Sequence, residues 1–155
     1  MRFPIAAALA LTAATSLHAQ APAPASPDFS IATPLPGTWT YAPATGGSEA
    51  TFLDANSRPQ LFLNCTRAAR QVTIAKPATG AAPYIGVWTS AQSRNLSASF
   101  NPATNRLSAT VPAFDPLLDS MAFSRGRIAF SVSGQPPLVV PSWEEVARVI
   151  EDCRT

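Results

Sequence analysis

Short segments in which apolar and polar residues alternate begin at Gly37, and they limit the fold more than any other feature of the chain. One segment places Leu107, Ala109 and Val111 at every second position. Such alternation is typical of a strand that buries one face and exposes the other. Segments of the same period lie around 39–41, 50–52, 61–65, 72–74, 85–87, 96–100 and 128–132, and 138–140 reads as a last short strand. About eight or nine short strands predict a mainly β domain, an antiparallel β-sandwich or a barrel-like fold.

The sequence also predicts two helices among the strands. Asp115 followed by Pro116 is typical of an N-cap and a first helical residue, and Gly126 is expected to end this short helix. Ser142 and Glu145 have the spacing of a capping box that opens a second, C-terminal helix.

The C-terminal helix has a distinct apolar face. The residues at its i, i+3, i+4 and i+7 positions are Val146, Val149, Ile150 and Cys153. This spacing predicts a buried stripe, and Trp143 is expected to anchor the helix in the core. Glu144, Arg148 and Asp152 lie four residues apart on another face, where they are expected to form ion pairs.

The chain contains two cysteines, Cys65 and Cys153. Cys65 shares its strand face with Leu61 and Leu63, and Cys153 lies on the apolar stripe of the helix, so both are expected to point inward. In an exported protein an even number of cysteines indicates a disulfide. A bond across about 90 residues contributes about 4–5 kcal/mol by the chain-entropy estimate. Two free thiols or a redox pair are the alternative, although redox pairs usually lie close together as Cys-x-x-Cys.

The first residues have the features of a secretory signal peptide. Arg2 supplies the positive charge, and the apolar run at 5–17 is shorter than the roughly 20 residues that a membrane-spanning helix needs. Cleavage is expected after Ala19, with an uncleaved anchor helix as the alternative. We therefore predict a signal peptide at 1–19, a Pro- and Ala-rich linker at 20–36 and a single β-rich domain at 37–155, periplasmic or secreted.

Processing after Ala19 would remove His18, the only histidine of the chain. With both cysteines bonded, the mature protein then lacks the usual ligands of zinc and the usual bases that activate a nucleophile. Lys76 is the single lysine, and the formal charge of +2 falls to about +1 with the loss of Arg2, too little to indicate nucleic acid or a membrane surface as partner. We expect no cofactor, no metal and no stable membrane span after processing.

Carboxylates are the groups that remain for catalysis. Asp54 or Glu49 together with Asp115 or Asp119 would make a glycosidase-like pair. All four residues also suit ordinary roles as turn residues, helix caps or solvated side chains, so we expect no enzyme.

Arg125 and Arg127 flank Gly126 in the densest polar segment of the domain. As a functional feature, the two guanidinium groups are a candidate contact for an anionic ligand such as a carboxylate, a phosphate or an acidic glycan. The structural alternative is that the arginines are solvated or pair with Asp115, Asp119 or the acidic C-terminal helix.

Hydroxyl side chains occupy polar positions on several of the predicted strands. They are Ser97, Ser99, Ser108, Thr110 and Ser131. This set is either a binding surface or, as is more common, the solvated side of a sheet.

The tail of the chain, with the sequence P-S-W-E-E-V-A-R-V-I-E-D-C-R at 141–154, resembles an uncharacterised family of small exported bacterial proteins. The similarity covers roughly the last 30 residues and extends to 96–98 and to the strand of Cys65. It implies export and carries no activity. The layout, with a strand cysteine and a C-terminal helix that ends in cysteine, is also similar to small periplasmic accessory proteins of secretion systems.

These observations favour a periplasmic, non-enzymatic binding or accessory protein of the cell envelope. Its expected partner is an envelope protein of unknown identity or an anionic ligand. A small inhibitor of an envelope hydrolase and a carboxylate-only glycan hydrolase are the alternatives.

Overall fold

The computed structural model describes residues 27–155. The predicted signal peptide, its cleavage site after Ala19 and the first part of the predicted linker lie outside the described residues. Within the described range the chain forms ten β-strands, two α-helices and a 3₁₀ turn at Arg67–Ala69. The antiparallel sheets and the two helices confirm the fold class predicted from the alternation.

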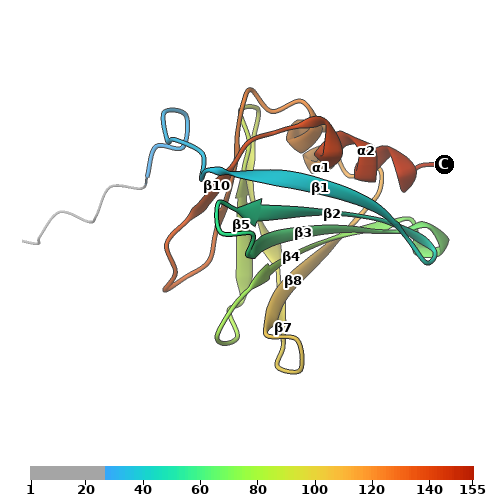
Figure 1. Cartoon of the computed structure of the whole chain (residues 1–155), viewed down its shortest axis with the longest axis horizontal. Helices are drawn as coiled ribbons and strands as arrows, with labels where there is room; N and C mark the ends of the chain where they lie inside the picture. The colour runs from blue at the N-terminus through green and yellow to red at the C-terminus, as the bar shows by residue number, and fades with distance from the viewer. Residues whose placement is uncertain (1–26) are drawn as a thin grey trace, which may run out of the picture.

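Two antiparallel sheets make up the domain (Figure 1). The larger sheet has the order β1 (Gly37–Ala44), β2 (Gly47–Asp54), β3 (Pro59–Thr66), β4 (Gln71–Pro77), β8 (Arg106–Pro112) and β7 (Ser99–Asn101). The smaller sheet has the order β10 (Leu138–Val140), β9 (Ile128–Ser131), β5 (Tyr84–Trp88) and β6 (Ser93–Ser97). Each sheet turns one face to a shared core and the other outward, which is why its strands alternate in sequence.

The sheets meet along both sides, so the sandwich approaches a closed barrel. On one side the chain passes directly from β6 in the smaller sheet to β7 in the larger sheet, with Ala98 between them. On the other side the N–H of Leu35 donates to the carbonyl of Val139 in β10 (2.7 Å). The indole N–H of Trp39 in β1 donates to the carbonyl of Pro141, just after β10 (2.8 Å). These junctions cover strand edges that would otherwise expose unpaired backbone groups.

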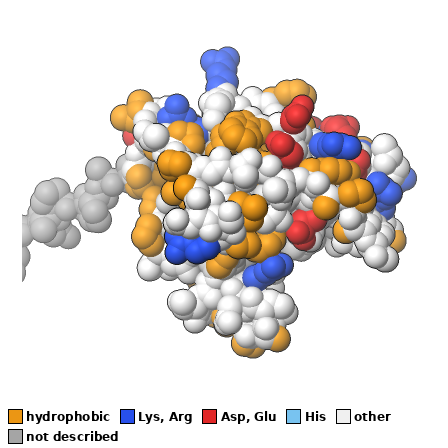
Figure 2. Space-filling model, viewed as in Figure 1, with side chains coloured by type: hydrophobic (Ala, Val, Ile, Leu, Met, Phe, Trp, Pro, Cys, Tyr) orange, Lys and Arg blue, Asp and Glu red, His pale blue; other side chains and the backbone are white. Residues whose placement is uncertain are grey.

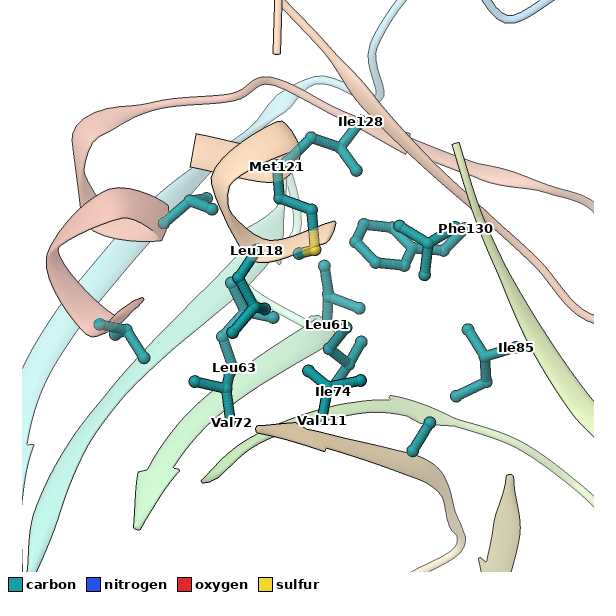
Figure 3. Close-up of a cluster of buried hydrophobic side chains, with 14 of the residues drawn as sticks. Leu61, Leu63, Val72, Ile74, Ile85, Val111, Leu118, Met121, Ile128 and Phe130 are labelled. Carbon is teal, nitrogen blue, oxygen red and sulfur yellow. The ribbon is translucent and has the colours of Figure 1, made fainter. Parts of the chain in front are cut away.

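The core lies between the sheets and includes the inner face of α1 (Pro116–Ala122). Figure 3 shows Leu118 and Met121 of α1 pointing into the same cluster as Leu61 of β3 and Phe130 of β9. The largest fully buried side chains come from both sheets and both helices: Phe52, Phe130, Leu61, Leu63, Ile74, Ile85, Leu107, Leu117, Leu118, Met121, Ile128 and Ile150. The predicted strand faces therefore meet in one core.

The helix α1 begins as predicted and ends earlier than predicted. The carboxylate of Asp115 accepts the N–H of Leu117 (2.9 Å), as an N-cap does. The helix ends at Ala122, so the prediction that Gly126 ends it is wrong. After the helix, the buried hydroxyl of Ser124 holds the chain in a turn through bonds to the backbone. Gly126 lies within this turn, with a φ of 76°.

The second helix, α2 (Glu144–Asp152), lies against β1, β2 and β3 of the larger sheet. Its predicted apolar stripe is confirmed, because Val146, Val149, Ile150 and the following Cys153 are fully buried. The predicted capping box is wrong. The N-cap is Trp143, and the hydroxyl of Ser142 donates to the carbonyl of Met121 at the end of α1 (2.9 Å). A partner on another helix has thus replaced the local bond.

The exposed side of α2 also differs from the prediction. Between residues 27 and 155 no ion pair joins Glu144, Arg148 and Asp152. Instead, the guanidinium of Arg148 lies 3.9 Å from the centre of the Tyr41 ring, and the Tyr41 hydroxyl donates to Asp152 (2.6 Å). Trp143 is 45% exposed, so the prediction that it anchors α2 in the core is wrong.

The predicted disulfide between Cys65 and Cys153 is present. It joins β3 to the end of α2, with the two Cα atoms 5.4 Å apart. Arg154 adds a second attachment, because its guanidinium donates to the carboxylate of Asp119 in α1 (2.7 Å) and to the carbonyl of Ala113 (2.9 Å). The C-terminal end is therefore tied both to the larger sheet and to α1.

Candidate functional site

The described residues offer few of the usual signs of a site. Between residues 27 and 155, no helix combines the length and the apolar character that crossing a membrane requires. The same range contains no group of three or more His, Cys, Asp or Glu side chains placed to hold a metal ion. On the face shown in Figure 2, basic and acidic side chains are interspersed, and the acidic ones gather toward the helical end. Individual groups in unusual surroundings are therefore the remaining candidates for a site.

Lys76 is such a group. It lies on β4 at the same alternation as Val72 and Ile74, which are fully buried, and it therefore points toward the inner face of the larger sheet. Its cross-strand neighbour on β8 is Leu107, also fully buried. The Lys76 side chain is 7% exposed. The strand thus places the single lysine of the chain at the margin of the core.

The amino group of Lys76 bonds to a neutral partner. Its Nζ donates to Oε1 of Gln135, in the loop between β9 and β10 (2.6 Å). The ion pairs formed by residues 27–155 all use arginines, and none includes Lys76. Removing an ammonium group from water without a counterion is unfavourable, and burial accordingly lowers the pKa of Lys76.

A cavity of about 440 Å³ lies beside Lys76. Its walls are largely apolar, with Leu35, Pro77, Pro136, Pro137, Leu138 and Val139 as the apolar residues and Thr33, Gln60 and Gln135 as the uncharged polar ones. The segment before β1, the start of β3, the end of β4 and the loop leading into β10 together line it. The volume falls in the range of roughly 300–1,000 Å³ that is typical of small-molecule sites.

Gln60 is held in the cavity wall by Asp54. The Gln60 side-chain amide donates to the Asp54 carboxylate (3.0 Å), which also accepts the N–H of Asn56 (2.8 Å) and pairs with the guanidinium of Arg58 (2.9 Å). The backbone N–H of Arg58 is the main cause that lowers the pKa of Asp54, and the neighbouring bonds add to it. The negative charge of Asp54 is thus already satisfied within its own hairpin.

Part of the predicted linker forms another wall of the cavity. Thr33 and Leu35 line it, and the bond from the Leu35 N–H to Val139 holds the segment beside β10. The guanidinium of Arg127 donates to the carbonyl of Ala32 in the same segment. Residues 32–35 therefore pack against the domain.

The structure separates the two arginines that were candidates for an anion contact. Arg127 bonds to the backbone of Ala32, while the Arg125 side chain is exposed and forms no hydrogen bond with residues 27–155. Neither arginine forms an ion pair within residues 27–155, so the pairing part of the structural alternative does not hold, whereas the exposed Arg125 agrees with its solvated part. A joint role for Arg125 and Arg127 in anion binding stays a prediction.

Each carboxylate that was considered for catalysis bonds to a neighbouring side chain. The partners are Asn64 for Glu49, Arg58 for Asp54, Arg94 for Asp115 and Arg154 for Asp119. These bonds agree with the ordinary roles of turn residue, helix cap and ion-pair partner. Nothing in their surroundings favours a glycosidase-like pair.

Sequence reasoning did not select Lys76 as a site residue. A signal was present, because the alternation of Val72 and Ile74 continues to position 76, where an apolar residue would be expected. A charged residue at an inward position of a strand is uncommon unless it has a partner. The signal was weak because Pro77 follows at once and placed Lys76 at a strand end, where charges are common.

Replacing Lys76 by methionine tests its unusual surroundings through pH. Because the pKa is lowered in the folded chain, the unfolded chain binds more protons between that pKa and the ordinary value of 10.5. Wild-type stability should therefore rise relative to Lys76→Met as the pH increases through this window. Urea unfolding of both proteins at about pH 7 and about pH 10.5 measures the difference between their free energies of unfolding. Groups that titrate alike in both proteins cancel in this difference. A difference that is the same at both pH values would contradict the burial of the charge.

Comparisons of the chain with protein-family models, with curated proteins and with solved structures gave no match.

Proposed function

We propose that this chain is an exported, non-enzymatic binding protein of the cell envelope that takes up a small amphipathic anion in the cavity beside Lys76. The observation that carries the proposal is the buried amino group of Lys76, which lines the cavity and has no acidic partner between residues 27 and 155. An anion in the cavity supplies that missing counterion.

The hydrogen-bonding capacity of Lys76 supports an oxyanion as the ligand. An ammonium group has three donors, and Gln135 accepts one of them. The other two are available to carboxylate, sulfonate or phosphate oxygens. Hydrogen bonds between ionised partners are roughly twice as strong as neutral ones, and the low exposure of Lys76 strengthens them further.

The walls of the cavity favour a ligand that also has an apolar body. Leu35, Leu138 and Val139 and three prolines would remain against water if a small inorganic anion bound alone. Covering apolar surface contributes roughly 25 cal/mol per Å², so an alkyl or aryl group adds affinity that a bare anion lacks. A carboxylate with a chain of moderate length satisfies both parts of the site.

The surroundings of Lys76 support binding without catalysis. Among the described residues its amino group contacts the amide of Gln135, and no ion pair places a carboxylate beside it to exchange protons. The Cys65–Cys153 disulfide is typical of oxidising compartments, and together with the predicted signal peptide it supports a periplasmic or secreted location.

Octanoate and its neutral analogue octanamide test the charge recognition directly. Isothermal titration near neutral pH should show that the wild-type chain binds octanoate about 10–100-fold more tightly than octanamide, the preference expected from one hydrogen bond to a charged group. Lys76→Gln should bind the two compounds alike. Wild-type protein that binds them equally, or that binds neither, would overturn the proposal.

Arg125→Gln is the matched control for this experiment. It also removes one cation, but from an exposed position outside the cavity. Its preference for octanoate should equal that of the wild type. If Arg125→Gln loses the preference and Lys76→Gln keeps it, the anion site lies at the arginine segment predicted from sequence, and the Lys76 cavity is not the site.

A further inference from the structure

The outer face of the smaller sheet carries a hollow that the Lys76 cavity does not include. Gly86 lies in the middle of β5, directly between its cross-strand neighbours Asn95 on β6 and Ser131 on β9. Because Gly86 has no side chain, the side chains of Ser131 and Asn95 can lie close over its backbone. A Cβ atom on Gly86 would overlap the Ser131 hydroxyl and crowd the Asn95 amide oxygen.

Hydrogen-bonding groups line this hollow. Its volume is about 250 Å³, and its lining residues are Tyr84, Gly86, Asn95, Ser131, Val132 and Ser133. The side chains of Asn95, Ser131 and Ser133 form no hydrogen bond with any other residue of the range 27–155, so their donors and acceptors are available to a ligand.

Aromatic rings stand on the same face of β5. Tyr84 and Trp88 lie two positions to either side of Gly86, on its side of the strand, and the Tyr84 side chain is 51% exposed. The ring of Phe29 packs on Trp88, with ring centres 6.0 Å apart. Tyr84 therefore offers an open ring face, and the Phe29–Trp88 pair forms a wall beyond the hollow.

This face carries no charge at the outward positions of β5, β6 and β9. Those positions hold Tyr84, Gly86, Trp88, Ser93, Asn95, Ser97, Ala129 and Ser131. Arg94 of β6 turns the other way and pairs with Asp115 at the start of α1 (2.7 Å). An exposed ring beside uncharged amide and hydroxyl groups is complementary to a sugar, which has an apolar C–H face and a rim of hydroxyls.

We infer that the outer face of the smaller sheet binds an uncharged oligosaccharide, with one sugar stacked on Tyr84 and bonded to Asn95 and Ser131 over Gly86. The span from Tyr84 to Trp88 is roughly 13 Å along the strand, longer than a single sugar ring, so the ligand is an oligosaccharide. This inference is independent of the anion cavity, which lies elsewhere and uses none of these residues.

Amide chemical shifts test this inference and locate the ligand at the same time. The probes are cellohexaose, xylohexaose, maltohexaose and chitohexaose, each titrated into the ¹⁵N-labelled chain to about 5 mM, enough to half-saturate a millimolar site. At least one of them should shift the amides of Gly86, Asn95 and Ser131 in a saturable way. Tyr84→Ala should weaken that binding about tenfold or more, and Asn95→Ala should also weaken it.

Phe123→Ala is the matched control, because Phe123 is an 82% exposed aromatic residue outside the hollow and its loss should leave sugar binding unchanged. Lys76→Gln should likewise leave it unchanged, which separates this site from the anion cavity. The inference is overturned if no probe shifts these amides, if Tyr84→Ala binds as the wild type does, or if oligogalacturonate, with a carboxylate on each sugar, binds more tightly than every neutral probe.

Discussion

Replacing Cys153 by serine should lower the free energy of unfolding by about 4–5 kcal/mol, the largest single effect that we expect in this protein. The bond to Cys65 closes a loop with a sequence separation of 88 residues. Closing a long loop restricts the unfolded chain strongly, and this loop contains the whole of the smaller sheet together with β4, β7 and β8 of the larger one. A domain of this size has a net stability of about 5–15 kcal/mol, so the loss of the bond removes a large part of the total.

The effect on α2 should be larger than the effect on the sheets. The helix is held by its apolar stripe, by the disulfide and by Arg154, which bonds to Asp119 and Ala113. Without the disulfide, the amides of α2 should exchange with solvent faster than those of β3 and β4. Hydrogen exchange of the variant measures this order.

Reduction provides the control for the cysteine variant. Guanidinium unfolding of the wild type with a reductant should approach the stability of Cys153→Ser, and the variant itself should not respond to reductant. Alkylation of the native wild-type protein should find no free thiol. A wild type that is equally stable with and without reductant would show that the bond does not contribute as stated.

Phe130→Ala should be the second most damaging of these changes, at about 3–5 kcal/mol. Phe130 lies on β9, is fully buried and points into the shared core with Leu61 and Ile85 (Figure 3). Truncation removes the transfer free energy of the ring and leaves a cavity that the surrounding side chains fill only in part. Urea unfolding with an unchanged m-value would measure the loss as a change in stability alone.

Phe123→Ala is the matched comparison, because the same atoms are removed from a side chain that is 82% exposed. Its stability should stay within about 0.5 kcal/mol of the wild type. A loss as large as that of Phe130→Ala would mean that Phe123 is buried against another molecule. Octanoate binding by folded Phe130→Ala should persist, since Phe130 does not line the cavity.

Periodicity was sufficient to predict much of the architecture. The alternation at 107–111 and in the other segments predicted an antiparallel fold. A strand of such a sheet turns one face to the core and the other outward, so apolar and polar residues alternate along it. The N-cap at Asp115 could be predicted because the bond to Leu117 is local. The disulfide could be predicted because Cys65 and Cys153 each lay on an apolar face and no other cysteine competed.

Two wrong predictions concern the start of α2. Ser142 was expected to cap its own helix, but the carbonyl of Met121 offers it a partner from α1. Trp143 was expected to fill the core, but it is 45% exposed, and α2 contributes Val146, Val149 and Ile150 to the core instead. For Ser142, a residue distant in sequence supplied the bond that the local rule had assigned within the helix.

From the sequence alone, rules of spacing, capping and cysteine content thus determined that this chain is mainly β, with two helices and one disulfide. Each of these rules depends on a few neighbouring residues or on one face of a single strand or helix. Only the tertiary structure decided which loops meet. The cavity beside Lys76 is formed by residues near 33, 60, 76 and 135, and the hollow at Gly86 by three strands. Surroundings assembled from distant segments leave no periodic pattern, so both candidate sites became visible only after the chain was folded.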